Sequence, residues 1–346
     1  MAYRAAADRL DRRNRQGRRN PGSGLEGKPR RADAKINLPG ACLEAEMIRN
    51  CSSILAIATL SLAMLDIHPG QAASQTLEKI KEVGKISFGY REASIPFAYL
   101  GADNKPTGLS LELCAAVAGR IKSELKRPVL EIEYIPVNAS NRIPLLQNGT
   151  IDIECGSTTN TAERQKQVSF SIATYVASPR WLVAATSPVT ELNGLDGQTI
   201  VVTQGSLNLA GVHKIIADQK LNAKIVQGKD HAESLLMLST SRAAAWFEDD
   251  ILVAGLVANS PDPKVFRMLP ATYAPTYYGL MTRREDPEFK ALVDSVIRQK
   301  MASGEFNKLY SKWFESPIPP KGQSLMLPMS DAMKARVASP SDALTP

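Results

Sequence analysis

The sequence has few of the residues and motifs on which metalloproteins and nucleotide-binding enzymes depend. Only three histidines and four cysteines occur among its 346 residues, and none of them form a cluster at metal-ligand spacing. The patterns G-x-x-x-x-G-K-[ST] and H-E-x-x-H are absent, and G-x-G-x-x-G does not occur in residues 75–346. The sequence therefore predicts no metal and no other cofactor, and we expect the protein not to be an enzyme.

One short stretch, KDHAES, suggests nucleophilic catalysis. It places Asp230, His231 and Ser234 close together in sequence. A catalytic triad, however, is assembled by geometry across a fold, and the nucleophile elbow G-x-S-x-G does not occur in this chain. The stretch therefore gives hydrolase chemistry only weak support.

The apolar run at residues 54–65 is too short to cross a membrane as a helix, which takes about 20 residues. Met47 and Arg49 precede it, and small residues follow it up to Ser74. This order is typical of a secretory signal peptide. We predict a signal peptide at residues 47–74 with cleavage near residues 72–74, translation from Met47, and a mature protein that is free in the periplasm.

Strong charge of one sign is missing from most of the chain. Residues 1–46 have eleven Lys/Arg and six Asp/Glu, a net charge of +5, so the other 300 residues carry only +2 of the total of +7. The first 46 residues have no apolar period and are rich in Arg, Gly and Pro, which predicts a disordered basic extension upstream of the true start. A nearly neutral remainder argues against a nucleic-acid partner.

Two of the four cysteines, Cys42 and Cys51, precede the expected mature protein. Cys114 and Cys155 remain, and an oxidising compartment would allow them to form a disulfide. Two buried thiols are the alternative, since a sequence does not give the Cα separation on which a disulfide depends.

Strand and helix patterns alternate along the mature chain. Residues 85–90, 129–137 and 151–155 have strand patterns, and helical patterns separate them. A second series of strands and helices runs from about residue 199 to residue 268, and a long helix is expected from residue 287 to about 314. This alternation predicts an α/β protein with two lobes.

The second lobe is predicted to be inserted into the first. We expect two chain crossings, near residues 175–182 and 268–275, to form a hinge of two strands. The predicted boundaries are 75–176 with 272–320 for lobe 1, 177–271 for lobe 2, and 321–346 for a C-terminal tail.

Polar side chains follow four of the expected strands. Arg91 follows the first strand, and the residues Gly-Ser-Thr-Thr at 156–159 follow the third, with Arg164 soon after. In the second lobe, residues 203–206 and Asp249 occupy the same kind of position. Ligands of open α/β sheets bind outside the carboxyl ends of strands, and small donors with a nearby arginine suit a carboxylate. The alternative for residues 156–164 is a capped surface helix with an exposed Arg164.

Several longer stretches resemble the family-3 extracellular solute-binding proteins, in particular those that bind glutamate and aspartate for ATP-driven importers. The resemblance covers roughly residues 75–335 and implies the type II periplasmic-binding-protein fold, in which two lobes close on one ligand. The stretches that carry it are GYREASIPFAYL, NRIPLLQNGTIDIECGSTTNTAERQKQVSFS, GKDHAES, FEDDILVAG and SPIPPKGQSLMLPMSDAMKA.

The resemblance implies two groups of ligand-binding residues. For the side-chain carboxylate of the ligand these are Arg91 and Arg142, with help from His231. For the α-amino and α-carboxylate groups they are Ser157, Thr159 and Arg164. Asp249 would pair with the ammonium group, and Ser206 matches the hydroxyl-rich loop of the second lobe.

Two positions depart from the family pattern. Ala139 stands three residues before Arg142, where a Ser or Thr is expected, and Leu207 replaces a hydroxyl residue after Ser206. Three arginines against Asp249 give the expected site a charge of about +2, which favours a ligand with two carboxylates.

We therefore expect a monomeric periplasmic protein that captures L-glutamate or L-aspartate and delivers it to the permease subunits of an ABC transporter. Two alternatives stay open. One is an enzyme on the same fold, a cyclohexadienyl or arogenate dehydratase, for which Glu154 and Glu248 are the unassigned carboxylates near strand ends. The other is the ligand-binding module of a sensor.

Overall fold

The computed structural model describes residues 74–345. The predicted basic extension at residues 1–46 and nearly all of the predicted signal peptide lie outside this range. The described residues all belong to one compact unit. Ser74 caps the first helix, α1 (Gln75–Val83), because its hydroxyl accepts a hydrogen bond from the Leu77 amide.

The first sheet has five strands in the order β5-β1-β6-β15-β7. The strand β1 pairs in parallel with β5 and β6, whereas β15 runs antiparallel to β6 and β7. The bounds are β1 (Lys85–Tyr90), β5 (Glu131–Pro136), β6 (Ile153–Glu154), β7 (Val168–Phe170) and β15 (Met281–Arg283).

The second sheet repeats this arrangement in the order β11-β10-β12-β9-β13. Here β10 pairs in parallel with β11 and β12, and β9 runs antiparallel to β12 and β13. The bounds are β9 (Pro179–Ala184), β10 (Thr199–Thr203), β11 (Lys224–Gly228), β12 (Ala245–Asp249) and β13 (Phe266–Met268).

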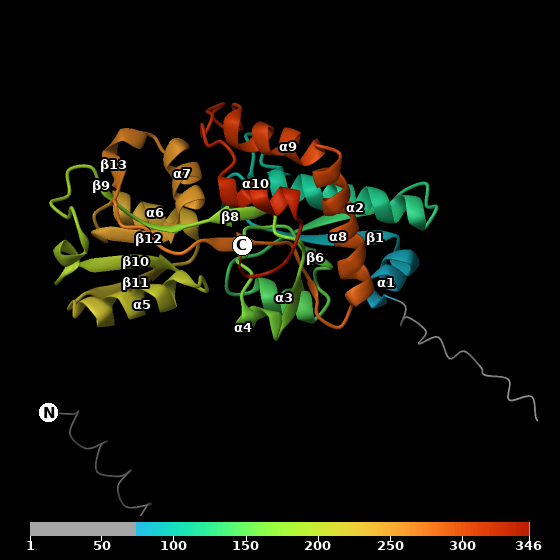
Figure 1. Ribbon diagram of the computed structural model, residues 1–346, viewed down its shortest axis with the longest axis horizontal. Helices are drawn as coiled ribbons and strands as arrows, with labels where there is room; N and C mark the ends of the chain where they lie inside the picture. Colours follow the sequence, from blue (N-terminus) through green and yellow to red (C-terminus); the bar gives the residue numbers. More distant parts are fainter. Residues whose placement is uncertain (1–73, 346) are drawn as a thin grey trace, which may run out of the picture. The chain divides into compact units, whose positions relative to one another are not determined.

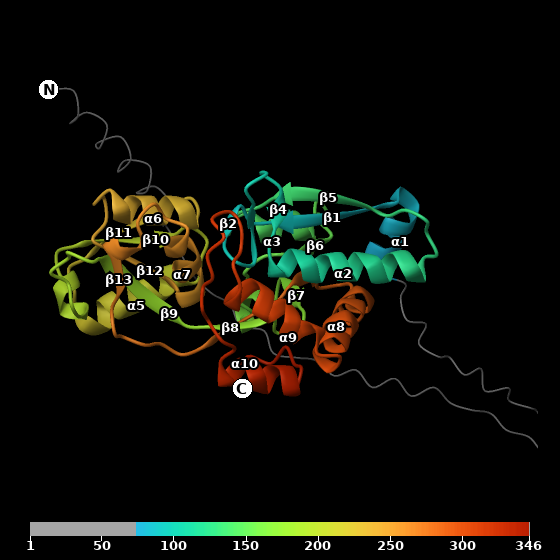
Figure 2. The ribbon, with the colours of Figure 1, turned by 90° about the horizontal axis from the view of Figure 1, so that it is seen from above.

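Helices cover both faces of each sheet (Figures 1 and 2). The apolar faces of α2 (Leu109–Glu124) and α8 (Pro287–Ala302) pack on one side of the first sheet, and α3 (Arg142–Gln147) packs on the other. On the second sheet, α5 (Asn208–Gln219) covers one face, while α6 (His231–Ser239) and α7 (Asp250–Ala258) cover the opposite one. Each sheet is therefore the middle layer of an α/β lobe.

Two short strands connect the lobes, β8 (Tyr175–Ala177) and β14 (Thr276–Tyr278), and they pair antiparallel. The first crossing lies where the sequence predicts it, but the second begins just after the predicted residues 268–275. The reason is local, because Pro270 and Pro275 lack the amide hydrogen that sheet pairing needs. A small sheet of β2 (Ala93–Ser94), β3 (Ala98–Leu100) and β4 (Pro106–Thr107) completes the first lobe.

The long C-terminal helix predicted over residues 287–314 is wrong as a single element. Gly304 adopts the left-handed conformation at φ +77°, which ends α8 and starts α9 (Glu305–Tyr310), and a π-helical turn follows at Ser311–Glu315. The predicted tail also contains a helix, α10 (Asp331–Ala338), whose Met333 is fully buried.

Cys114 of α2 and Cys155, which follows β6, form a disulfide. Both residues are fully buried in the core of the first lobe. Among residues 74–345, none of the helices combines the length and the apolar character that crossing a membrane requires.

Candidate functional site

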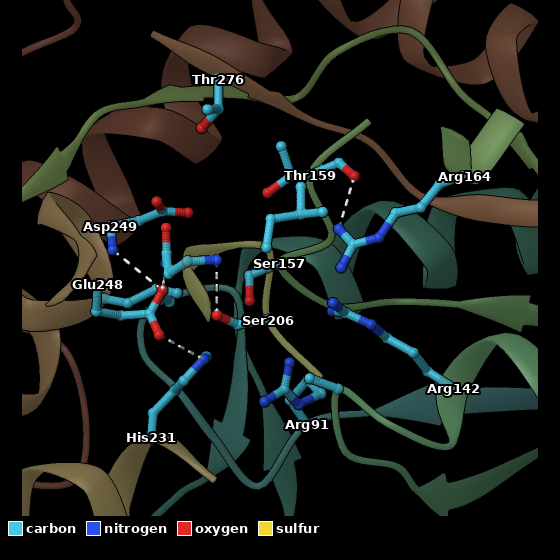
Figure 3. A pocket seen from close by; sticks show the side chains of 14 residues that line it. Arg91, Arg142, Ser157, Thr159, Arg164, Ser206, His231, Glu248, Asp249 and Thr276 are labelled. Carbon is cyan, nitrogen blue, oxygen red and sulfur yellow. Dashed lines mark hydrogen bonds and ion pairs between the residues drawn. The ribbon is translucent and has the colours of Figure 1, made fainter. Parts of the chain in front are cut away.

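The candidate site is a pocket at the carboxyl ends of the parallel strands, with residues from both lobes around it (Figure 3). The pocket is small, with a cavity volume of about 40 Å³. All eight predicted ligand-binding residues line it: Arg91, Arg142, Ser157, Thr159, Arg164, Ser206, His231 and Asp249.

Three arginines of the first lobe lie on one side of the pocket (Figure 3). Arg91 directly follows β1, Arg142 is the first residue of α3, and Arg164 lies in the short helix α4 (Ala162–Gln165). Each is less than a tenth exposed, so the exposed Arg164 of the alternative interpretation is wrong. Burial lowers the pKa of Arg91 to about 10 and that of Arg164 to about 9, which leaves both cationic at neutral pH.

Glu154 supplies a buried negative charge behind the arginines. Its Oε2 accepts a hydrogen bond of 2.9 Å from the Thr158 hydroxyl, and its Oε1 lies 4.0 Å from Nη1 of Arg142. A Cβ atom at position 156 would lie 2.2 Å from that Oε1, so only Gly156 leaves room for the carboxylate beside Arg91. Burial raises the pKa of Glu154, and Arg142 and Thr158 oppose this shift because they favour the ionised form.

The loop after β6 offers donors to the pocket. The Ser157 hydroxyl is buried and has no hydrogen-bond partner among residues 74–345, so it is available to a ligand. The Thr159 carbonyl accepts a bond of 2.9 Å from Nη1 of Arg164, which fixes the guanidinium. Thr161 caps α4, since its hydroxyl accepts from the Arg164 amide. The helix is capped as the alternative interpretation expects, but its arginine points into the pocket.

The lobes approach each other closely at the loop after β10. Nη2 of Arg164 lies 3.4 Å from the Gly205 carbonyl of the second lobe. Gly205 has φ +75°, and a Cβ there would lie 2.7 Å from the Ala139 carbonyl carbon. Ser206 follows, and its hydroxyl accepts a bond of 3.0 Å from the Asn208 amide at the start of α5.

His231 is the first residue of α6 and is buried beneath the pocket. Its Nδ1 lies 3.2 Å from the Ser94 hydroxyl, and its Nε2 lies 3.7 Å from Oε2 of Glu248. Burial, reinforced by the positive charges of Arg91 and Arg142, lowers the pKa of His231 well below its usual value, so the imidazole is neutral. Ser234 bonds the Asp230 carbonyl instead of His231, so KDHAES does not form a triad.

Two adjacent carboxylates of the second lobe face the arginines, Glu248 and Asp249 at the end of β12 (Figure 3). The Tyr278 hydroxyl, from the hinge strand β14, donates a hydrogen bond to Oδ2 of Asp249. Burial raises the pKa of Asp249 to about 6 and that of Glu248 to about 8. The third acid of the run, Asp250, points away and accepts hydrogen bonds from the Ser178 and Ile251 amides.

Sequence reasoning did not assign several residues that line the pocket. Ala139 and Leu207, the two departures from the family pattern, both line it, and so do Asn208, Glu248, Leu252 and Thr276. The sequence indicates Glu248 only as an unassigned carboxylate near a strand end. Phe247, Glu248 and Asp249 are all buried in β12. The pattern of residue types along the strand therefore does not show which of these side chains faces the pocket.

The chain belongs to the bacterial extracellular solute-binding proteins, family 3, which it matches over residues 86–316. It is 42% identical over 298 residues to the L-glutamate/L-aspartate-binding protein of Pseudomonas aeruginosa, covering 85% of this chain and 98% of the relative. It is 39% identical to the glutamate/aspartate import solute-binding protein of Escherichia coli K12, covering 86% of this chain and 98% of the relative.

Solved structures give the same fold. A mutant of ArgBP from T. maritima is similar with a TM-score of 0.61 and 26% identity, covering 69% of this chain and 99% of the other. The architecture is that of the type II periplasmic amino-acid-binding proteins, with two α/β lobes and a two-strand hinge, as the sequence predicts.

Proposed function

We propose that this protein captures an acidic amino acid, L-glutamate or L-aspartate, in the periplasm and delivers it to the permease subunits of an ABC transporter. The observation that carries the proposal is the distribution of charge around the pocket. Three buried arginines of the first lobe face Asp249 of the second lobe across the pocket. An amino acid with two carboxylates and one ammonium group is complementary to this arrangement.

The two ends of such a ligand have different partners. Arg164, held by the Thr159 carbonyl, would bind the α-carboxylate with the free Ser157 hydroxyl, and Asp249 would bind the ammonium group. Arg91 and Arg142 would bind the side-chain carboxylate, with the neutral His231 and Ser206 completing the shell. A neutral ligand would leave a buried arginine without its partner, which costs several kcal/mol.

The lobes supply the means of delivery. We propose that residues 75–176 and 272–320 move as one body and residues 177–271 as another about β8 and β14. A ligand that contacts both lobes stabilises the closed form by the difference between its affinities for the two forms. The named relatives, which bind or import glutamate and aspartate, support the same ligand class and a permease partner.

Calorimetric titration of the mature protein against the twenty amino acids tests the proposal. We expect glutamate and aspartate to bind most tightly by a wide margin, and the protein to be a monomer by light scattering. Prephenate and arogenate are included as substrates in a parallel assay, because the dehydratase alternative predicts their consumption. Turnover of either compound, or tighter binding of a basic or apolar amino acid, would overturn the proposed function.

A further inference from the structure

One carboxylate of the pocket has a free oxygen and no assigned role. Glu248 is only 2% exposed and lines the pocket. Its Oε1 is occupied, since it accepts bonds of 2.5 Å from Nδ2 of Asn208 and 3.1 Å from the Asp249 amide. Its Oε2 has no hydrogen-bond partner within the part of the chain that the structure describes. A buried, unpartnered carboxylate oxygen is costly, which indicates that a ligand contacts it.

The free oxygen points to the side-chain end of the ligand. Oε2 lies 3.7 Å from Nε2 of His231, and Figure 3 shows it on the face of the pocket opposite Arg91 and Arg142. The neutral imidazole does not act as a cationic partner for Glu248. Whatever occupies the space beside His231 therefore meets Glu248 as well.

The charge count of the pocket depends on Glu248. With Glu154 and Asp249 ionised and Glu248 protonated, three arginines and two carboxylates leave a net charge of +1. This charge balances glutamate or aspartate, each of net charge −1. When Glu248 is ionised the net charge is zero, which balances glutamine or asparagine. Because unpaired charge is expensive in a buried site, each state favours a different ligand.

The groups around Glu248 act on its pKa in opposite directions. Burial, and next the charge of Asp249, raise its pKa, whereas the Asp249 amide, the Thr203 hydroxyl and Arg91 favour its ionised form. The charged or titratable groups near it on the packed elements are Arg91, Arg142, Arg180, His231, Asp249 and Tyr278, of which Arg180 on β9 bonds the Ala271 carbonyl.

We propose that Glu248 is a further specificity-determining residue, resting on the proposed function: protonated, its Oε2 donates a hydrogen bond to the side-chain carboxylate of an acidic amino acid, and ionised, it accepts one from a side-chain amide. The proton stays on Glu248 in the glutamate complex and is absent from it in the glutamine complex.

Proton linkage predicts how the ratio of the glutamate affinity to the glutamine affinity changes with pH. If the two complexes differ by one bound proton, the ratio of the glutamate affinity to the glutamine affinity falls tenfold for each unit of pH. This slope does not depend on the pKa of Glu248 in the free protein, because both ligands start from the same free state. Titration of Arg91 or Arg164 in the free protein cancels from the ratio for the same reason.

The test is calorimetric titration of the wild type with glutamate and with glutamine between pH 6.5 and 8.5. We expect the affinity ratio to fall about a hundredfold across this range. In Glu248→Gln, which resembles the protonated form but cannot titrate, the ratio should stay constant with pH. Glu92→Gln is the matched control, because Glu92 is exposed beside Arg91 and does not line the pocket, and it should keep the slope of the wild type.

The outcomes separate the two proposals. A ratio that is independent of pH in the wild type, or a wild-type slope retained in a folded Glu248→Gln protein, would overturn the role of Glu248 and leave the proposed function intact. If the wild type bound neither ligand at any pH, the proposed function itself would fail, and the role of Glu248 with it. Thermal melting of each variant verifies that it is folded.

Discussion

The two lobes have the same sheet topology and opposite chemistry. In both, the second strand of the sheet order (β1 or β10) pairs in parallel with its two neighbours, and the fourth strand (β15 or β9) is antiparallel. The first lobe directs three arginines at the pocket, however, whereas the second directs Glu248 and Asp249 at it. The comparison teaches that the fold decides where a site lies, and the side chains at the strand ends decide what it binds.

The lobes also differ in how they are stabilised. The first contains the Cys114–Cys155 disulfide and receives the C-terminal helix α10. Arg336 of α10 lies over the ring of Tyr277 in the hinge strand β14, at 4.6 Å from the ring centroid. The predicted second lobe, residues 177–271, has no cysteine. Covalent and C-terminal reinforcement is thus confined to the lobe that holds the arginines together.

The largest effect is expected from removing the arginine that we assign to the α-carboxylate, a group that all amino acids share. Arg164→Ala should weaken binding of every amino acid by about 3–5 kcal/mol, because it leaves the α-carboxylate desolvated without its partner. Calorimetry with glutamate, glutamine and aspartate measures the loss. Near-normal glutamate affinity would place Arg164 outside the binding site.

Arg142→Ala is the matched comparison for that experiment. It removes another buried guanidinium of the same lobe, but one that we assign to the side-chain end of the ligand. It should weaken glutamate and aspartate more than glutamine and asparagine. An equal loss for all four ligands would contradict the assignment.

Loss of the disulfide should destabilise the first lobe more than the second. The cross-link closes a loop of 41 residues, so its loss should lower the free energy of unfolding by about 3–4 kcal/mol. Denaturant unfolding of Cys114→Ser/Cys155→Ser, followed by hydrogen exchange, measures this loss. Exchange should accelerate in β1 and α2 more than in β10 and α5, and equal acceleration in both lobes would show that they unfold as one unit.

The smallest effect is expected from a change in the second lobe, at the aspartate that we assign to the ammonium group of the ligand. Asp249→Asn should reduce glutamate affinity by about 2 kcal/mol, since a charged hydrogen bond to the ammonium group becomes a neutral one. It should also weaken ligand-driven closure, because Asp249 is bonded to Tyr278 of the hinge as well as facing the first lobe. X-ray scattering of both proteins saturated with glutamate measures the radius of gyration. Full compaction of the mutant would restrict Asp249 to a role in affinity.

Much of the fold could be predicted because its signals are local. The helical spacing of Leu113, Val117 and Ile121 predicts α2, and alternating apolar residues predict β5. The split of residues 287–315 into three helical segments was missed, since the left-handed conformation of Gly304 has only a weak local signal. The short β14 was displaced because Pro275 determines where the pairing begins.

The sequence by itself determined the α/β alternation, the polar residues at the strand ends and, through the family resemblance, eight of the residues that line the pocket. Those features depend on residue type and spacing within single segments. Only the tertiary structure decided that Glu248 is buried with one free oxygen, that Asn208 holds the other, and that Gly205 meets Ala139 across the cleft. The physical reason is that burial and charge balance depend on distances between side chains from separate segments, which the fold alone brings together.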